Sequence, residues 1–333
     1  MENKNLYITQ SWQLSRKDNT LFFQNESTQK VIPIANIEQI FCLWEVTINS
    51  KLLNFLTKNM ITIHFFNYYG YYSWSYYPRE NYVSGKLFVN QVNHYQNTSS
   101  RLEIASNIVE WIWNNMISSL RHYQRHHKNV EKYIHKIQEM LVGIKSKKDI
   151  NQVLFVEWSL WDVYYNSFKE FLPEEFVLNK RVKRPPDNPI NALISFWNSV
   201  LYTYVLTKIY HTQLNPTISY LHEPFQRRFS LALDISEVFK IPLVYGNIFN
   251  MVNRGVLKVE KHFMHDVNYA VLNEEGRKLF LRYWDERVQK TVDHPKLKRK
   301  VSYGSLIKFD CYKLIKHIMW EEQFVPFSLE KNY

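Results

Sequence analysis

The stretch Arg101–His126, RLEIASNIVEWIWNNMISSLRHYQRH, shows how the chain is organised. Apolar residues recur in it every three or four positions, which is the spacing of one face of an α-helix. This stripe consists of Ile104, Ile108, Trp111, Ile112, Met116, Leu120 and Tyr123. The spacing therefore predicts a long amphipathic helix that buries one face against a core.

The same helical period continues toward the carboxyl terminus. It predicts further helices over residues 129–143, 150–171, 189–212, 230–239, 274–292 and 303–321. The most apolar segment, Leu193–Leu206, contains several polar residues and is too short to cross a bilayer. We expect it to form a core helix.

The residues before the long helix follow a two-fold pattern instead. Short β-branched and aromatic runs alternate there with polar turn residues, which is typical of strands. The expected strands are Leu6–Ile8, Thr20–Phe23, Lys30–Pro33, Ile37–Ile40 and Met60–Phe66, with one helix at Ser50–Lys58. The sequence thus predicts an α+β fold, with a β-rich domain over residues 1–85 and a larger all-α domain over residues 86–333. The linker is expected within residues 77–90, where Pro78, Asn81 and Gly85 interrupt both patterns.

Composition excludes several classes of function. The chain has 333 residues, of which 45% are hydrophobic, so it can bury a core. Only 7 residues are glycine, and neither a P-loop nor a G-x-G-x-x-G motif is found in the sequence. Cys42 and Cys311 are too isolated to suggest a thiolate zinc cluster or a disulfide framework. The first residues do not resemble a signal peptide, so we expect a cytoplasmic protein.

The charge balance favours a polyanionic partner. Formal net charge is +11, from 42 Lys and Arg against 31 Asp and Glu. Residues 1–90 contribute +2 and residues 91–333 contribute +9. Binding to DNA or RNA is one interpretation, because neutralised phosphates release their counterions. A solvated basic surface is the other.

Glu157 lies on the apolar stripe of the helix expected over 150–171. A carboxylate on a core-facing stripe must be paired, protonated or bound to a cation, since an isolated buried charge is costly. A salt bridge to one of the many Lys or Arg residues and a cation site both satisfy this requirement.

A second group of candidate residues surrounds the helix expected over 230–239. Ser230 is a candidate N-cap, and Asp234 and Glu237 share one helical face. With His222 before the helix, they offer carboxylate and imidazole ligands, which suit Mn²⁺ and tolerate Mg²⁺. The alternative is a loop histidine and two acids on a solvent-exposed face.

Three runs, in order along the chain, carry a family resemblance. They are RPPDNPINALISF (184–196), LNPTISYLHEP (214–224) and SLALDISEVF (230–239). The chain resembles the CRISPR adaptation integrases, the metal-dependent DNA endonucleases that insert new spacers into CRISPR arrays in antiviral defence. The resemblance extends from the first strand to a closing segment at Glu322–Phe327.

The resemblance implies a site and a chemistry. Glu157, His222 and Glu237 would be catalytic and would bind Mg²⁺ or Mn²⁺, with Asp234 as a fourth ligand or as the group that orients His222. A 3′-hydroxyl of incoming double-stranded DNA, the prespacer, would attack a phosphodiester of the CRISPR repeat or leader. Because His222 can bind a metal only when neutral, activity should fall as the pH drops below the imidazole pKa.

The resemblance also implies partners. The β-rich domain would form a homodimer, and two dimers would bridge a small ferredoxin-like adaptation protein in a heterohexamer. No membrane partner is expected. Three positions depart from the family pattern, where a glycine, an arginine and an aspartate are usual and this chain has Trp158, Lys240 and Tyr245.

Basic and aromatic clusters are candidate DNA contacts. The arginines favoured for phosphate contacts are Arg184, Arg227, Arg228, Arg121 and Arg125. Aromatic residues between Phe65 and Tyr77 could stack on bases or pack within the sheet. Two other functions stay open from the sequence, a stand-alone metal-dependent nuclease acting in DNA repair and a non-catalytic DNA-binding scaffold.

Overall fold

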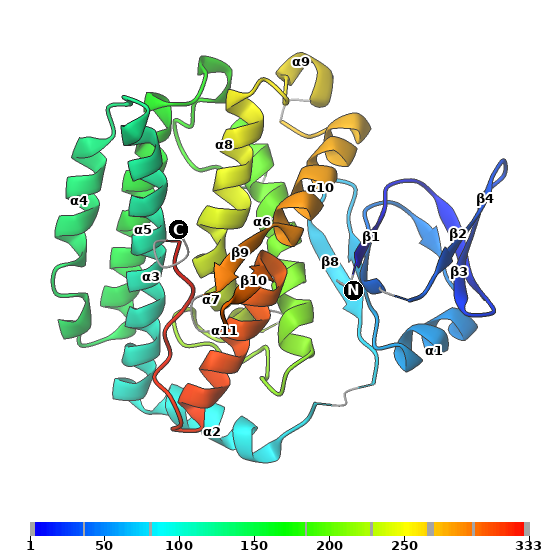
Figure 1. Cartoon of the computed structure of the whole chain (residues 1–333), viewed down its shortest axis with the longest axis horizontal. Helices are drawn as coiled ribbons and strands as arrows, with labels where there is room; N and C mark the ends of the chain where they lie inside the picture. Colours follow the sequence, from blue (N-terminus) through cyan, green and yellow to red (C-terminus); the bar gives the residue numbers. More distant parts are fainter. Residues whose placement is uncertain are drawn as a thin grey trace. The chain divides into compact units, whose positions relative to one another are not determined.

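The computed structural model describes residues 4–35, 37–79, 82–183, 185–226, 229–264, 270–294 and 297–329. Its strand-rich beginning and mostly helical remainder confirm the α+β fold class (Figure 1). The chain divides into two compact units. The strand unit comprises Met1–Asn81 and Asn273–Asp285, and the helical unit comprises Tyr82–Leu272 and Glu286–Tyr333.

The strand unit contains two four-stranded sheets. One has the order β1 (Lys4–Ile8), β5 (Ile37–Cys42), β7 (Thr62–Phe66) and β8 (Tyr72–Tyr76). The other has the order β4 (Gln29–Pro33), β3 (Thr20–Gln24), β2 (Trp12–Lys17) and β6 (Val46–Thr47). Their inward residues form one apolar core with helix α1 (Ser50–Lys58), which Asn49 caps. Strands β2, β6 and β8 were not predicted.

The helical unit contains both helices that follow the predicted apolar stripes and helices that were not predicted. They are α2 (Gly85–Gln96), α3 (Thr98–Arg125), α4 (Glu131–Leu141), α5 (Ile150–Asn166), α6 (Pro189–Tyr210), α7 (Ser230–Phe239), α8 (Gly246–Asn253), α9 (Val259–His262) and α11 (Tyr303–Ile318). Helix α10 (Glu274–Gln289) belongs to the strand unit up to Asp285 and to the helical unit from Glu286 onward. No helix among the described residues is long and apolar enough to cross a membrane.

Local chemistry explains where the structure departs from these expectations. Gly85 does not interrupt a helix but begins α2, because Ser84 accepts a hydrogen bond from the backbone N–H of Leu87. Helices α2, α8 and α9 were not predicted. A two-stranded hairpin, β9 (Thr291–His294) with β10 (Arg299–Ser302), adds strands to a region expected to be entirely helical.

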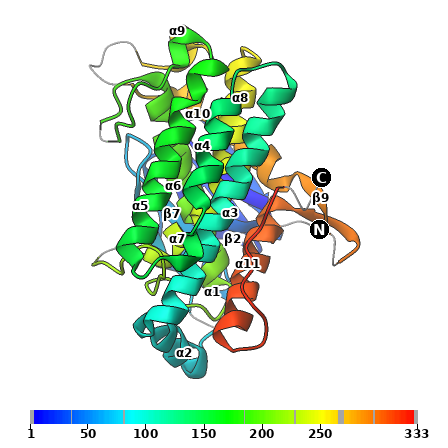
Figure 2. The same ribbon diagram turned by 90° about the vertical axis from the view of Figure 1, so that its left-hand side faces the viewer.

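Helix α7 is the central element of the helical unit. It packs against α3, α6 and α11, which are labelled with it in Figure 2. Almost all of its ten residues are buried. Ser230 does not cap it, contrary to the sequence prediction. Its hydroxyl instead donates to the carbonyl of Thr217 at 2.8 Å, which ties the helix start to the preceding loop. Polar side chains on α7 are therefore held in fixed positions.

Candidate metal centre on the central helix

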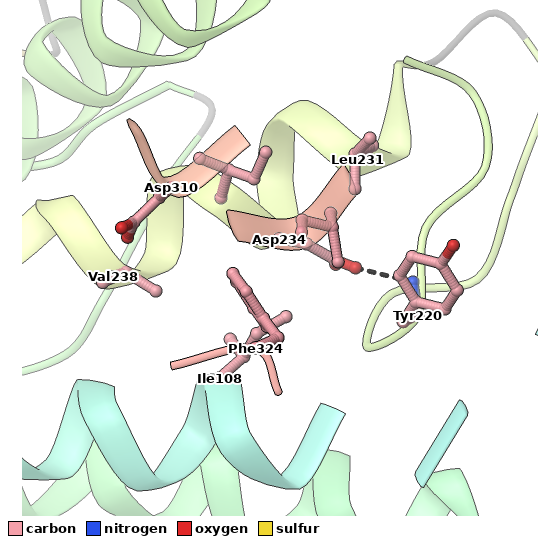
Figure 3. Close-up of a pocket in the computed structure, with 9 residues that line it drawn as sticks. Ile108, Tyr220, Leu231, Asp234, Val238, Asp310 and Phe324 are labelled. Carbon is pink, nitrogen blue, oxygen red and sulfur yellow. Dashed lines mark hydrogen bonds between the residues drawn. The ribbon is translucent and has the colours of Figure 1, made fainter. Parts of the chain in front are cut away.

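Asp234 of α7 organises the loop that precedes the helix. Its buried carboxylate accepts hydrogen bonds from the backbone N–H groups of Tyr220 at 2.7 Å, Leu221 at 3.0 Å and His222 at 3.0 Å. Figure 3 shows the bond to Tyr220. A buried carboxylate is costly unless such donors surround it. Asp234 therefore fixes the backbone that carries His222.

The same carboxylate orients the ring of His222. Nδ1 of His222 lies 2.8 Å from Oδ1 of Asp234. Since an ionised carboxylate only accepts, Nδ1 donates, and Nε2 carries the lone pair of the neutral ring. Burial acts to lower the pKa of His222, but the hydrogen bond to Asp234 and the charges of Asp234, Glu237 and Glu157 outweigh it and raise that pKa.

Glu237 lies one turn further along α7 and is also buried. Its Oε1 accepts a hydrogen bond from the ammonium group of Lys240, which also lies over the ring of Trp161 at 5.1 Å. Among the described residues, no donor reaches its other oxygen, Oε2, although that atom is buried. Such an atom requires explanation, and a cation bound there would provide one.

A π-helical segment, Lys240–Tyr245, follows the end of α7 directly and begins three residues after Glu237. Pro242 explains it, because proline has no N–H to bond to the carbonyl of Val238 and its ring crowds that carbonyl. The carbonyl of Val238 instead accepts a hydrogen bond from the side chain of Asn115 on α3, at 3.0 Å. Arg287 donates to the carbonyl of Pro242 at 2.8 Å. The backbone just beyond Glu237 is thus held from two sides.

Glu157 approaches from α5, where it is half-buried. Burial and the negative charge of Glu237 raise its pKa to about 7, against the opposing charges of Lys240 and His222. The structure therefore brings all four predicted acid and imidazole residues into one electrostatic neighbourhood. The solvent-exposed face considered for Asp234 and Glu237 is wrong, since both are buried.

The donors fit a hard divalent cation by type, but they do not converge in this arrangement. Among the described residues, no three His, Cys, Asp or Glu side chains are placed to hold a metal ion. Two of the carboxylates are bonded to other groups, since Lys240 binds Glu237 and backbone N–H groups bind Asp234. The two carboxylates of Glu157 and Glu237, one of which has an unbonded buried oxygen, and the lone-pair nitrogen of His222 are nevertheless ligand types that suit Mg²⁺ or Mn²⁺.

Other cations surround these carboxylates. The charges of Arg181 and Lys240 act on Lys183, as do those of Glu237 and Glu157. Arg181 is held in place by hydrogen bonds to Asn191 at 2.8 Å and Ser195 at 2.9 Å. The positive groups balance the acids and leave a neighbourhood suited to an anionic ligand.

Of the five arginines predicted to contact DNA, two lie among the residues that the structure describes. Arg121 and Arg125 are exposed on the last turns of α3. Arg184, Arg227 and Arg228 lie outside the described residues. Of the aromatic residues expected at the sheet, Phe65 and Trp74 stack across neighbouring strands at 3.9 Å, whereas Tyr68 and Tyr69 are exposed.

The positions that depart from the family pattern have distinct environments. Tyr245 is buried in an aromatic cluster, and its hydroxyl is 2.8 Å from that of Tyr165. Lys240 is the ion-pair partner of Glu237, and Trp158 is exposed. Asn115 was not singled out from the sequence, because an asparagine on an apolar stripe carries no signal of the backbone carbonyl that it will bond.

A small cavity lies behind the site residues. Its volume is about 10 Å³, which is room for one water molecule. Ile108, Leu231, Val238 and Phe324 line it together with Asp234 (Figure 3). It is too small for a nucleotide. Glu157 and His222, by contrast, are partly exposed.

Comparison with known proteins identifies relatives over nearly the whole chain. The family model described as CRISPR associated protein Cas1 matches residues 6–286. The CRISPR-associated endonuclease Cas1 3 of Thermodesulfovibrio yellowstonii is 46% identical, covering 98% of this chain and 99% of the relative. The CRISPR-associated endonuclease Cas1 of Fusobacterium nucleatum is 41% identical, covering 98% and 96%.

Solved structures of similar proteins superpose on this chain over nearly its whole length. The Cas1 protein of Thermotoga maritima superposes with a TM-score of 0.87 at 37% identity, covering 97% of this chain and 99% of that one. A casposase bound to its integration product also gives a TM-score of 0.87, covering 100% of this chain and 95% of that one. At 18% identity, that second likeness shows a common fold.

Proposed function

The chain belongs to the Cas1 family of CRISPR-associated proteins, and we propose that it is the DNA endonuclease and integrase that joins new spacers to a CRISPR array. The observation that carries this proposal is that His222 and Glu157 lie close enough to Glu237, on the buried helix α7, for the three charges to act on one another. This grouping occurs in a chain whose relatives, matched over nearly their full length, are named endonucleases.

The proposed metal ligands are Glu157, Glu237 and Nε2 of His222. Asp234 is better suited to a supporting role, since both of its oxygens already accept hydrogen bonds and one of them orients the imidazole. A bound Mg²⁺ or Mn²⁺ would act as a Lewis acid on the phosphoryl oxygen and help to activate the nucleophile. Glu237 would offer Oε2, which no donor among the described residues reaches, while Lys240 holds Oε1.

The remaining work is positioning. Phosphoryl transfer needs little covalent chemistry from the protein, so rate enhancement depends on aligning the 3′-hydroxyl with the target phosphodiester and stabilising charge. Lys240, which is bonded to Oε1 of Glu237, is placed to stabilise negative charge beside that carboxylate. Arg121 and Arg125 are proposed to contact phosphates of double-stranded DNA, as are Arg184, Arg227 and Arg228.

The proposed assembly follows the family resemblance. Residues 1–85 would form the homodimer contact, and two dimers would bridge a small ferredoxin-like adaptation protein. The resulting heterohexamer would hold the prespacer across both dimers, with residues 86–333 carrying the catalytic sites. A stand-alone nuclease would need neither the partner nor a 3′-hydroxyl donor.

A strand-transfer assay tests the proposed function. The protein is incubated with supercoiled plasmid and a labelled duplex that has 3′-hydroxyl ends, in Mn²⁺ or in EDTA. We expect label to become joined to plasmid only with Mn²⁺, and a duplex with 3′-dideoxy ends to give none. Plasmid nicking without joining would indicate the stand-alone nuclease, and DNA binding without either reaction would indicate the scaffold.

Mn²⁺ affinity should depend on pH through Glu157. Its pKa is raised to about 7, so the carboxyl group is largely protonated at pH 6 and must lose that proton to bind a cation. Affinity should therefore be about eightfold weaker at pH 6 than at pH 7.5, and the raised pKa of His222 acts in the same direction. Calorimetry at both pH values measures this, with Glu157→Gln as the control, which should leave only the smaller dependence that His222 contributes. Equal affinity at the two pH values would contradict the assignment.

A further inference from the structure

Two large aromatic side chains lie exposed on α5, on either side of Glu157 in sequence. Phe155 is 66% exposed and Trp158 is 64% exposed. Their ring centroids are 6.3 Å apart and their planes differ by 34°, so the two rings form one continuous, slightly bent surface. Leaving this much aromatic surface in water is unfavourable, and such surfaces often bind a ligand.

A third exposed aromatic residue lies on the other element of the site. Phe225, which is 73% exposed, follows His222 by three residues. His222 and Glu157 act on each other electrostatically, so the loop and α5 meet at the candidate metal centre. Each of these two elements therefore presents aromatic surface next to its proposed metal ligand.

The charges nearby restrict what could cover these rings. Lys183 is exposed, and the charges of Lys240, Arg181 and both glutamates of the site act on it. A ligand for this surface should combine negative charge with a flat apolar face. A nucleotide has both, whereas a purely apolar partner would not use the cations.

We infer that Trp158, with Phe155 beside it, stacks on an unpaired nucleobase of the DNA strand that enters the candidate metal centre. The inference rests on the proposed function, and it adds a subsite for single-stranded ends. Base faces are hidden by stacking within a duplex and become available where the strand is unpaired. Glu157 and Trp158 differ in direction by about 100° around the helix. Glu157 can therefore face the reacting phosphate while Trp158 contacts a neighbouring base.

The test measures DNA binding in EDTA, so that it does not depend on metal or catalysis. The probes are a blunt duplex and the same duplex with a short 3′ overhang that carries 2-aminopurine, whose fluorescence falls when it stacks. We expect Trp158→Ala to weaken overhang binding about tenfold and to abolish the quenching, while blunt binding is unchanged. Trp158→Phe should recover most of both signals, because it keeps an aromatic face.

Trp320→Ala is the matched control, since Trp320 is a tryptophan that is 75% exposed beyond the end of α11. It should bind both probes like wild type. Equal losses on blunt and overhang DNA, or no loss with Trp158→Ala, would overturn the inference. A change in oligomeric mass with Trp158→Ala would also overturn it, by assigning the surface to a protein contact. If wild-type protein quenches the probe but fails the strand-transfer assay, only the proposed function fails.

Discussion

Replacing Glu237 with glutamine should reduce strand transfer by about three orders of magnitude, since a few kcal/mol of metal-borne stabilisation are lost. The variant keeps the shape of the side chain and an oxygen that can accept from Lys240. What it loses is the negative charge that a divalent cation requires. Mn²⁺ affinity measured by calorimetry should fall with the rate.

Lys240→Gln is the matched control for this variant, because it removes the other partner of the same ion pair. If Glu237 is a metal ligand, Lys240→Gln should retain or increase Mn²⁺ affinity, since the competing ammonium is gone. If the pair is only structural, the two variants should alter stability in the same way and neither should change Mn²⁺ binding. Parallel behaviour of the two variants would contradict the assignment of Glu237.

Replacing Asp234 with asparagine should destabilise the protein by about 3 kcal/mol, because an amide presents N–H groups to donors that need an acceptor. Asp234 accepts from three backbone N–H groups and from the ring of His222, all in a buried setting. Urea unfolding measures this loss. Mn²⁺ affinity should also fall by about 10-fold to 100-fold, as expected when a group that orients a metal-binding histidine is lost.

Asp310→Asn separates these two effects. Asp310 of α11 is buried like Asp234, and it accepts from the backbone N–H of Phe327 and from Lys313, each at 2.7 Å. Its replacement should lower stability comparably while leaving Mn²⁺ affinity at the wild-type value. If both variants lose Mn²⁺ affinity equally, Asp234 would have no specific role at the site.

The helices were predictable because their signal is strong and local. The stripes over 150–171 and 230–239 correspond to α5 and α7, and their spacing alone indicates Glu157 and the acids of α7 as unusual positions. Strand β2 was missed because its second half, Ser15 to Lys17, is polar and basic. Strand pairing, which places such residues, is set by partners distant in sequence.

The site could be predicted as a set of residues but not as an arrangement. Sequence spacing put Asp234 and Glu237 on one face, but it did not show that Asp234 is used by the backbone of Tyr220, Leu221 and His222. Nor did it show that Lys240, one turn beyond Glu237, would bind that carboxylate. Both facts depend on the path of a loop and on the π-helical segment, which involve residues from several elements.

The measurement that tests the central claim most directly compares wild-type protein with His222→Ala in the strand-transfer assay, each with Mn²⁺ and with EDTA. Nε2 of His222 is the proposed nitrogen ligand. The side chain is partly exposed, and its replacement by the methyl group of alanine leaves the hydrogen bonds between Asp234 and the backbone in place. We predict that labelled duplex is joined to plasmid by the wild-type protein with Mn²⁺ and in none of the other three reactions. Equal joining by wild type and His222→Ala would contradict a metal centre built on His222, Glu157 and Glu237.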